Sequence, residues 1–100
     1  MSLKNYKLLP NRLQELRKEN QYSQKQLAQA IGVSEAMYSR IESGERAIQP
    51  TQIEMAAQYL KADVEELRSL LLADKIELET QDYSDSEFNK ALKALNKKEI

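Results

Sequence analysis

The sequence predicts an all-α protein, with five short helices and one further amphipathic helix near the C-terminus. Three observations support this fold class. Leu, Ala, Glu, Lys and Gln are abundant, whereas the 100 residues include only two glycines and two prolines, a composition that favours helices. Apolar residues recur at spacings of three and four, and no run alternates with a period of two. Most of these apolar patterns follow a residue suited to a helix N-terminus.

Five helices are expected in the first three quarters of the chain, each with its own start signal. Proline suits a first helical turn, and Ser or Asp followed three residues later by Gln or Glu predicts a capping box. The signals are Pro10, the pair Ser23 and Gln26, Ser34, Pro50 or Thr51, and the pair Asp63 and Glu66. The helices are expected at about residues 10–19, 24–30, 35–43, 50–60 and 64–72. Their short links predict a compact bundle.

The apolar face of each helix predicts the core. Gly32 and Gly44 fall at helix exits, where a tight turn requires the positive φ that glycine adopts most easily. Tyr38 is assigned to the core because it shares a face with Ile41. The residues expected to point inward are Leu9, Leu13, Leu16, Leu27, Ala28, Ile31, Tyr38, Ile41, Ile53, Ala56, Ala57, Leu60, Val64, Leu67, Leu70 and Leu71.

The available residue types argue against an enzyme. The chain has no Cys and no His, so it lacks thiolate zinc ligands, the commonest general base and the commonest metal ligand. Glu65 and Glu66 are adjacent on a helix, where their side chains point about 100° apart and form no catalytic pair. We therefore expect no catalytic residue, metal site or cofactor.

The sequence carries no signal for a membrane or for secretion. It has no apolar run of 18 residues and no secretory segment after Met1. We therefore expect a cytoplasmic protein that does not enter a membrane.

Charge is distributed unevenly along the chain. Residues 1–46 carry eight Lys or Arg and five Glu, whereas residues 74–88 carry one Lys and six acidic residues. The overall charge of -1 therefore allows a positive face on the first half, although a simple solvated surface would fit the charge equally well.

Two of the predicted helices form a helix-turn-helix arrangement. Only Ile31 to Ser34 join them, with Gly32 at the bend. Such a link sets the second helix across the first, so that its N-terminal half can enter a DNA major groove. The spacing alone also fits an ordinary helical hairpin.

The segment "SQKQLAQAIGVSEAMYSRIESGER" resembles the Xre/Cro family of lambda-repressor-like regulators. The resemblance covers about residues 9–72, including Arg12-Leu13, Leu16-Arg17, Gly32-Val33-Ser34 and the later "YLKADVEEL". It implies a five-helix lambda-repressor-like DNA-binding domain and a transcriptional regulator that binds double-stranded DNA.

The resemblance also implies roles for individual residues. Arg17 and Glu42 match a structural ion pair that holds the first helix against the third, and Gln24 and Arg46 match phosphate contacts. Arg12, Lys18 and Lys25 add positive charge for phosphate binding. The surface that faces base edges comprises Ser34, Glu35, Ala36, Met37, Ser39 and Arg40.

Three of these base-facing residues have chemically distinct options. Arg40 can donate two hydrogen bonds to guanine. Glu35 can accept a hydrogen bond from cytosine N4. Alternatively, its negative charge in the first turn can simply stabilise the helix, by about 0.3–1 kcal/mol, through the helix dipole. Met37 can contact the groove or belong to the edge of the core. Family members usually carry polar or basic side chains at positions 35 and 36, so Glu35 and Ala36 leave the operator sequence open.

The number of basic residues predicts a dimer. One copy offers few phosphate contacts, whereas two copies would double them and read half-sites about 34 Å apart in an inverted repeat. Alternatives are an antitoxin that grips a toxin through its C-terminal extension, or a controller protein of a restriction–modification operon, to which "LLLADKIELE…ALKAL" is faintly similar. A protein-binding adaptor with an inactive helix-turn-helix is an alternative of another class.

The end of the chain is expected to form a separate unit. We predict a DNA-binding domain at 1–73 and an acidic linker followed by an amphipathic helix at 74–100. Ser84 and Glu87 predict a capping box that opens a helix of about 85–97. A helix of this length is marginal alone in water, so its apolar stripe is expected to pack on its own domain, on a second copy or on another protein. The stripe contains Phe88, Ala91, Leu92 and Leu95.

Overall fold

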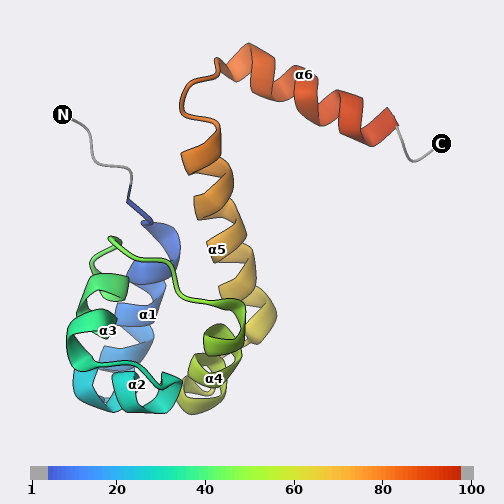
Figure 1. Ribbon diagram of the computed structural model, residues 1–100. Helices are drawn as coiled ribbons and strands as arrows, with labels where there is room; N and C mark the ends of the chain where they lie inside the picture. The colour runs from blue at the N-terminus through green and yellow to red at the C-terminus, as the bar shows by residue number, and fades with distance from the viewer. Residues whose placement is uncertain (1–4, 98–100) are drawn as a thin grey trace.

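A computed structural model describes residues 5–97 of the chain, and within this range it contains helices and no strand. The described residues form six helices, and Figure 1 shows the last of them projecting from a bundle made by the others. The all-α fold class is therefore confirmed. The helices are α1 (Leu8–Glu19), α2 (Gln24–Ile31), α3 (Glu35–Glu42), α4 (Pro50–Leu60), α5 (Val64–Glu79) and α6 (Asp85–Asn96).

One hydrophobic core joins α1, α2, α3, α4 and the first half of α5. Nearly all of the side chains expected inside are buried, and Ile48, in the link before α4, joins them. Val64 is the exception among them, since 36% of it is exposed, and Leu70 is half-buried. Val64 opens α5 at the rim of the bundle, where it lines an open groove between α4 and α5. The predicted core is thus correct apart from this edge.

The first helix begins two residues earlier than the sequence predicted, because a distant side chain caps it. Lys7 occupies the N-cap position and supplies no side-chain hydrogen bond. The carboxylate of Asp74 instead accepts hydrogen bonds from the backbone N–H groups of Leu8, at 2.9 Å, and Leu9, at 3.0 Å. Asp74 is only 4% exposed. It therefore satisfies two of the orphan donors of α1 and joins α5 to the start of α1.

Helix α5 is longer than expected and passes through the predicted domain boundary. It runs to Glu79 rather than ending near residue 72, so the first part of the predicted linker is helical. The capping box expected from Asp63 and Glu66 does not form. Asp63 accepts from the backbone N–H of Glu65 at 3.1 Å, while Glu66 binds Arg12 at 3.0 Å. A hydrogen bond between two charged groups is stronger than one to a neutral amide.

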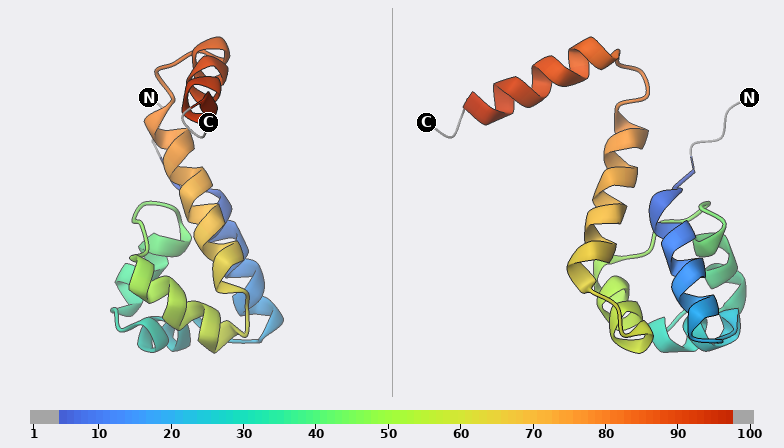
Figure 2. Two further views of the ribbon diagram at one scale, coloured as in Figure 1. Left: turned by 90° about the vertical axis from the view of Figure 1, so that its right-hand side faces the viewer. Right: turned by 180° about the vertical axis from the view of Figure 1, so that it is seen from behind.

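Helix α6 forms as predicted but lies away from the bundle. Its capping box is complete, since Ser84 accepts from the Glu87 N–H at 3.1 Å and Glu87 accepts from the Ser84 N–H at 2.8 Å. Figure 2 shows α6 crossing the end of α5 and extending into free space. None of its residues is buried, and residues 98–100 lie outside the described part of the chain. No helix within residues 5–97 combines the length and apolarity needed to cross a membrane.

Candidate nucleic-acid interface

The turn between α2 and α3 sets the direction of α3. Gly32 ends α2 with φ 76°, a left-handed conformation that costs glycine little. The backbone N–H of Val33 then bonds to the carbonyl of Ala28 at 2.9 Å. Ser34 caps α3 by accepting a hydrogen bond from the Met37 N–H at 3.1 Å. Both helix ends are therefore satisfied within a very short link.

Helix α3 has one face in the core and one face in solvent. Tyr38 is fully buried and Ile41 is 3% exposed. Met37 is half-buried and packs against the core, which favours the core-edge option for its side chain. The exposed side chains around this helix are Ser34, Glu35, Ala36, Ser39 and Arg40. The predicted base-reading residues, Met37 apart, thus lie together on one accessible surface.

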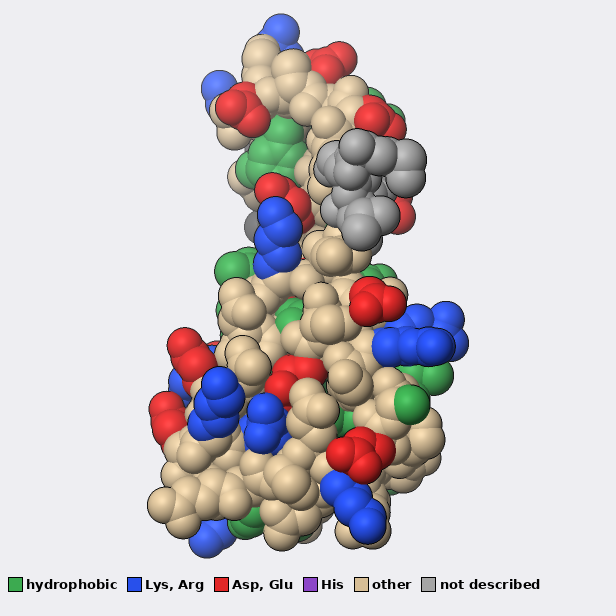
Figure 3. Space-filling model, turned by 90° about the vertical axis from the view of Figure 1, so that its left-hand side faces the viewer, with side chains coloured by type: hydrophobic (Ala, Val, Ile, Leu, Met, Phe, Trp, Pro, Cys, Tyr) green, Lys and Arg blue, Asp and Glu red, His purple; other side chains and the backbone are tan. Residues whose placement is uncertain are grey.

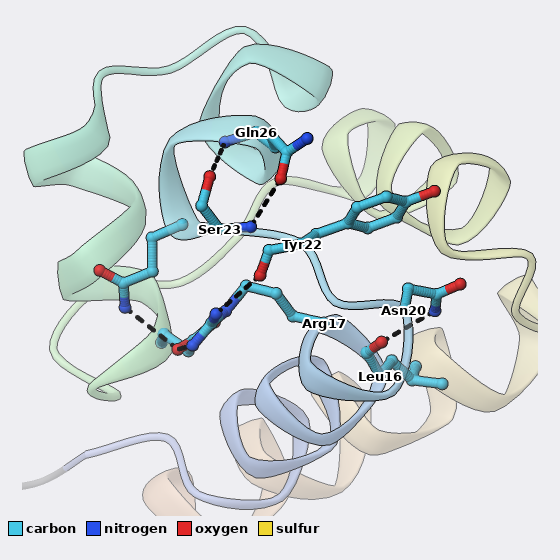
Figure 4. A network of polar contacts seen from close by, with 8 residues as sticks. Leu16, Arg17, Asn20, Tyr22, Ser23 and Gln26 are labelled. Carbon is cyan, nitrogen blue, oxygen red and sulfur yellow. Dashed lines mark hydrogen bonds and ion pairs between the residues drawn. The ribbon is translucent and has the colours of Figure 1, made fainter.

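A polar network beneath α3 ties it to α1 and α2. Arg17 of α1 binds both carboxylate oxygens of Glu42, at 2.8 and 2.9 Å, and also donates to the backbone carbonyl of Tyr22 at 2.9 Å. The side-chain amide of Gln24 donates to Glu42 at 3.1 Å. Figure 4 shows Arg17 reaching across to the segment that contains Tyr22. Such a bidentate pair fixes orientation as well as distance.

The electrostatics of this network favour a charged pair. The Arg17 and Glu42 side chains are only 13% and 3% exposed. Burial disfavours the charged form of Glu42, but the hydrogen bonds from Arg17 and Gln24 outweigh burial and hold its pKa below its ordinary value. The hydrogen bond to Glu42 in turn raises the pKa of Arg17. Burial, followed by the charge of Glu42, raises the pKa of the neighbouring Tyr38.

The exit of α3 is fixed by the chain that precedes α1. Gly44 is buried, and its φ is 90°. The backbone N–H of Tyr6 donates to the Gly44 carbonyl at 3.0 Å, and a Cβ at Gly44 would collide with the Tyr6 carbonyl. The close approach therefore requires glycine and holds the segment leading to Arg46.

The predicted phosphate ligands fall into two groups. Lys18, Lys25 and Arg46 are exposed, and none takes part in an ion pair among residues 5–97. Arg12 differs, because it lies 3.0 Å from both Glu15 and Glu66. The hydrogen bond to Glu15 and the charge of Glu66 raise its pKa. Its charge is already matched by two carboxylates, which favours a role in joining α1 to α5.

The face of the molecule that carries α3 is only mildly charged. Figure 3 looks from that side and shows separate Lys and Arg side chains, with acidic side chains between them and a largely uncharged surface around them. This face therefore offers an anion a few separate cationic side chains and backbone N–H groups rather than a broad positive field.

Two residues that fix the helices around this interface could not be identified from the sequence pattern. Asp74 acts on α1 from 66 positions away, and Tyr6 acts on the exit of α3 through its backbone. Only the second glycine, Gly44, hinted at a close backbone approach. Neither contact follows from the helical periodicity of the segment in which it lies.

Comparison with known proteins gives one result. Residues 13–67 match the sequence profile of the helix-turn-helix family HTH_3, which comprises the Cro/C1-type, Xre-like domains. The matched region runs from α1 into the first turn of α5 and includes all of α2 and α3. It leaves out Asp74 and α6. No curated protein shows significant similarity to the chain.

Proposed function

Because the chain belongs to the HTH_3 family of Cro/C1-type DNA-binding regulators, we propose that it binds a specific operator through α3 and does so as a dimer on an inverted repeat. The observation that carries this proposal is the rigid attachment of α3. Its inner face is buried, and Glu42 near its end is held by Arg17 and Gln24. A side chain that reads base edges must be held in one position to discriminate between them.

Base reading is assigned to the exposed surface of α3. Arg40 is exposed and takes no part in an ion pair within residues 5–97, so it can donate two hydrogen bonds to guanine O6 and N7. Ser39 can donate or accept, and Ala36 can contact a thymine methyl group. Glu35 can accept from cytosine N4. Met37 supports these residues from the edge of the core.

Phosphate binding is assigned to Lys18, Gln24, Lys25 and Arg46. Gln24 opens α2, where backbone N–H groups point outward and favour an anion. Its amide also contacts Glu42, so a phosphate bound at α2 would be linked to the network beneath α3. Arg12 is left out because Glu15 and Glu66 already bind it.

The small number of phosphate-binding side chains favours a dimer. Three cations and one amide per copy make few phosphate contacts, and the affinity gained from counterion release scales with their number. Two copies related by a two-fold axis double the contacts and read two half-sites about 34 Å apart. The operator is accordingly an inverted repeat.

The proposal is tested with two arginine variants. Arg40→Ala is expected to weaken operator binding by about 1–3 kcal/mol and to relax preference at one base pair per half-site. Arg46→Ala is expected to weaken binding to all sequences about equally and to reduce its salt dependence. Selection of bound sequences from a random pool, followed by titrations at several salt concentrations, measures both effects.

Lys93→Ala provides the matched control, since it removes an exposed positive charge from α6 and is expected to change neither quantity. If Arg40→Ala kept both affinity and sequence preference, the assignment of α3 to the groove would be wrong. A complete lack of salt-sensitive DNA binding would instead favour the adaptor, and a tight complex with the product of a neighbouring gene would favour the antitoxin.

A further inference from the structure

A groove runs between the start of α4 and the outer face of α5. Apolar residues from both helices line it, together with the polar side chains of Glu65, Arg68, Ser69 and Lys75. We call this surface the outer groove; its apolar lining includes Pro50, Ile53, Val64 and Leu72. Leu72 is 60% exposed, and Ile76, one turn further along α5, is 41% exposed. The outer groove is therefore an apolar surface on the side of α5 that faces away from α1.

The second unpartnered surface is the apolar stripe of α6. Phe88, Leu92 and Leu95 recur at helical spacing, and the latter two are 43% and 58% exposed. At 100° per residue, Asp85 and Asn89 lie along one side of this stripe. The lysines at 90, 93 and 97 lie on the opposite face. Glu87 lies along the other side, so the stripe is bordered by two acidic side chains and a neutral one and by no cation.

The link between α5 and α6 keeps these two surfaces apart within one chain. Figures 1 and 2 show α5 and α6 as the two arms of an L. At the corner, Ile76, Tyr83 and Phe88 line one shallow hollow, so the exposed apolar surface continues from the outer face of α5 onto α6. Beyond that corner, no residue of α6 is buried and none lines the outer groove of its own chain.

We infer that the outer groove binds α6 of a second copy, and that the exchange is reciprocal. The lengths match: on α5 the groove lining runs from Val64 to Lys75, eleven residues apart, or about 17 Å at 1.5 Å per residue. Helix α6, with 12 residues, is about 18 Å long. The charges are complementary as well, because Asp85 borders the stripe, whereas the groove carries two cations, Arg68 and Lys75, against one carboxylate, Glu65.

A two-fold arrangement follows from the placement of both surfaces on one chain. Each copy offers one helix and one groove, so reciprocal docking forms two identical contacts and closes the assembly at two copies. The inference deepens the proposed dimeric regulator by assigning its dimer contact. It places that contact away from α3, which stays free for DNA.

A charge exchange between two variants tests this arrangement. The groove variant is Arg68→Glu/Lys75→Glu, and the helix variant is Asp85→Lys/Asn89→Lys. Each alone places like charges at both contacts, so its dimer dissociation constant is expected to rise at least about tenfold. Mixing the two restores one contact with wild-type charges and one with exchanged charges. We therefore expect a 1:1 heterodimer, measured by sedimentation equilibrium and native mass spectrometry.

The control is Lys90→Glu/Lys93→Glu, which changes the net charge as much as the groove variant but lies on the opposite face of α6; its dissociation constant is expected to stay within about twofold. Melting temperatures verify that every variant folds. Dimers of wild-type stability in both variants would overturn the inference. A monomeric wild-type protein would also overturn it. In that case, a lower melting temperature of the variants would indicate that α6 docks in the groove of its own chain. An unchanged melting temperature would indicate that α6 binds a different protein. Because no DNA is present, a negative result leaves the test with Arg40 and Arg46 unaffected.

Discussion

Helices α3 and α6 begin in the same way, but α3 packs into the core and α6 does not. Each opens with a serine whose side chain accepts from a backbone N–H at 3.1 Å, Ser34 in α3 and Ser84 in α6. Helix α6 is longer, with 12 residues against eight, and its apolar stripe is larger. Yet α3 buries Tyr38 and Ile41, whereas α6 buries nothing. A local start signal and an apolar stripe make a helix, but only a facing surface makes it part of a core.

The difference lies in the number of independent attachments. Helix α3 is held by the core, by the Arg17–Glu42 pair and by the Tyr6–Gly44 hydrogen bond. In the described part of the chain, helix α6 is joined to α5 through residues 80–84 and lines one hollow with it at the corner. A helix that must present side chains to base edges needs the first kind of attachment. A helix that docks on another copy, as proposed for α6, must instead be joined to its own bundle by few contacts.

The largest expected effect comes from removing the attachment of α3 to α1. In Arg17→Ala, Glu42 loses its cation in a place where its side chain is 3% exposed. Removing one partner of a buried pair costs about 3–5 kcal/mol. Urea unfolding measures the loss, and Lys18→Ala, an exposed neighbour, is expected to stay within about 0.5 kcal/mol of the parent. Equal stability of Arg17→Ala and the parent would mean that the pair does not support α3.

A matched pair of core-type substitutions tests the comparison directly. Ile41→Ala in α3 is expected to lower the free energy of unfolding by about 2–5 kcal/mol, because it leaves a cavity at a buried site. Leu92→Ala in α6 is expected to change it by less than about 0.5 kcal/mol at protein concentrations too low for association. Chemical unfolding of both variants at one concentration provides the measurement. A loss above about 2 kcal/mol for Leu92→Ala would show that α6 packs on its own bundle.

The third prediction concerns the side chain that joins the bundle to the projecting part of α5. Asp74→Ala leaves the Leu8 and Leu9 N–H groups without their acceptor and is expected to cost about 1–3 kcal/mol. Asp74→Asn keeps one acceptor oxygen and should lose less. Hydrogen exchange of the Leu8 and Leu9 amides reports the cap itself. Asp82→Ala, an exposed acidic residue beyond α5, serves as control; slow exchange at Leu8 and Leu9 in Asp74→Ala would contradict the assignment.

The smallest effect separates the two serine caps. Ser34→Ala is expected to lower the stability of the whole bundle by about 1 kcal/mol, because α3 unfolds only with the core around it. At protein concentrations too low for association, Ser84→Ala is expected to leave the melting of the bundle unchanged and to reduce the helix content of residues 85–96. Circular dichroism and thermal melting of both variants distinguish the two results. Equal shifts in melting temperature would mean that α6 and α3 are held alike.

Much of this molecule could be predicted from local patterns. Capping residues and apolar spacing located all six helices, and the same spacing identified nearly every core residue, because a helix start and a helix face depend on residues within one or two turns. The segment from Ser23 to Arg46 identified the family, which the matched profile over residues 13–67 confirms. The surface around Arg40 was predicted as the DNA-reading face and remains a proposal.

Long-range contacts decided the rest. The sequence pattern predicts that Asp74 belongs to an acidic linker, yet it caps α1 across 66 positions. The spacing predicts that Glu66 is half of a capping box, yet it binds Arg12 across 54 positions. In both cases a carboxylate had a local option and a distant one. The distant partners, the free N–H groups of α1 for Asp74 and the guanidinium of Arg12 for Glu66, come within reach only when the chain has folded. Local propensity therefore could not predict which partner each carboxylate would bind. The sequence by itself determined where helices begin and which faces are apolar; the tertiary structure decided which carboxylates serve those helices and left α6 without a facing surface in its own chain.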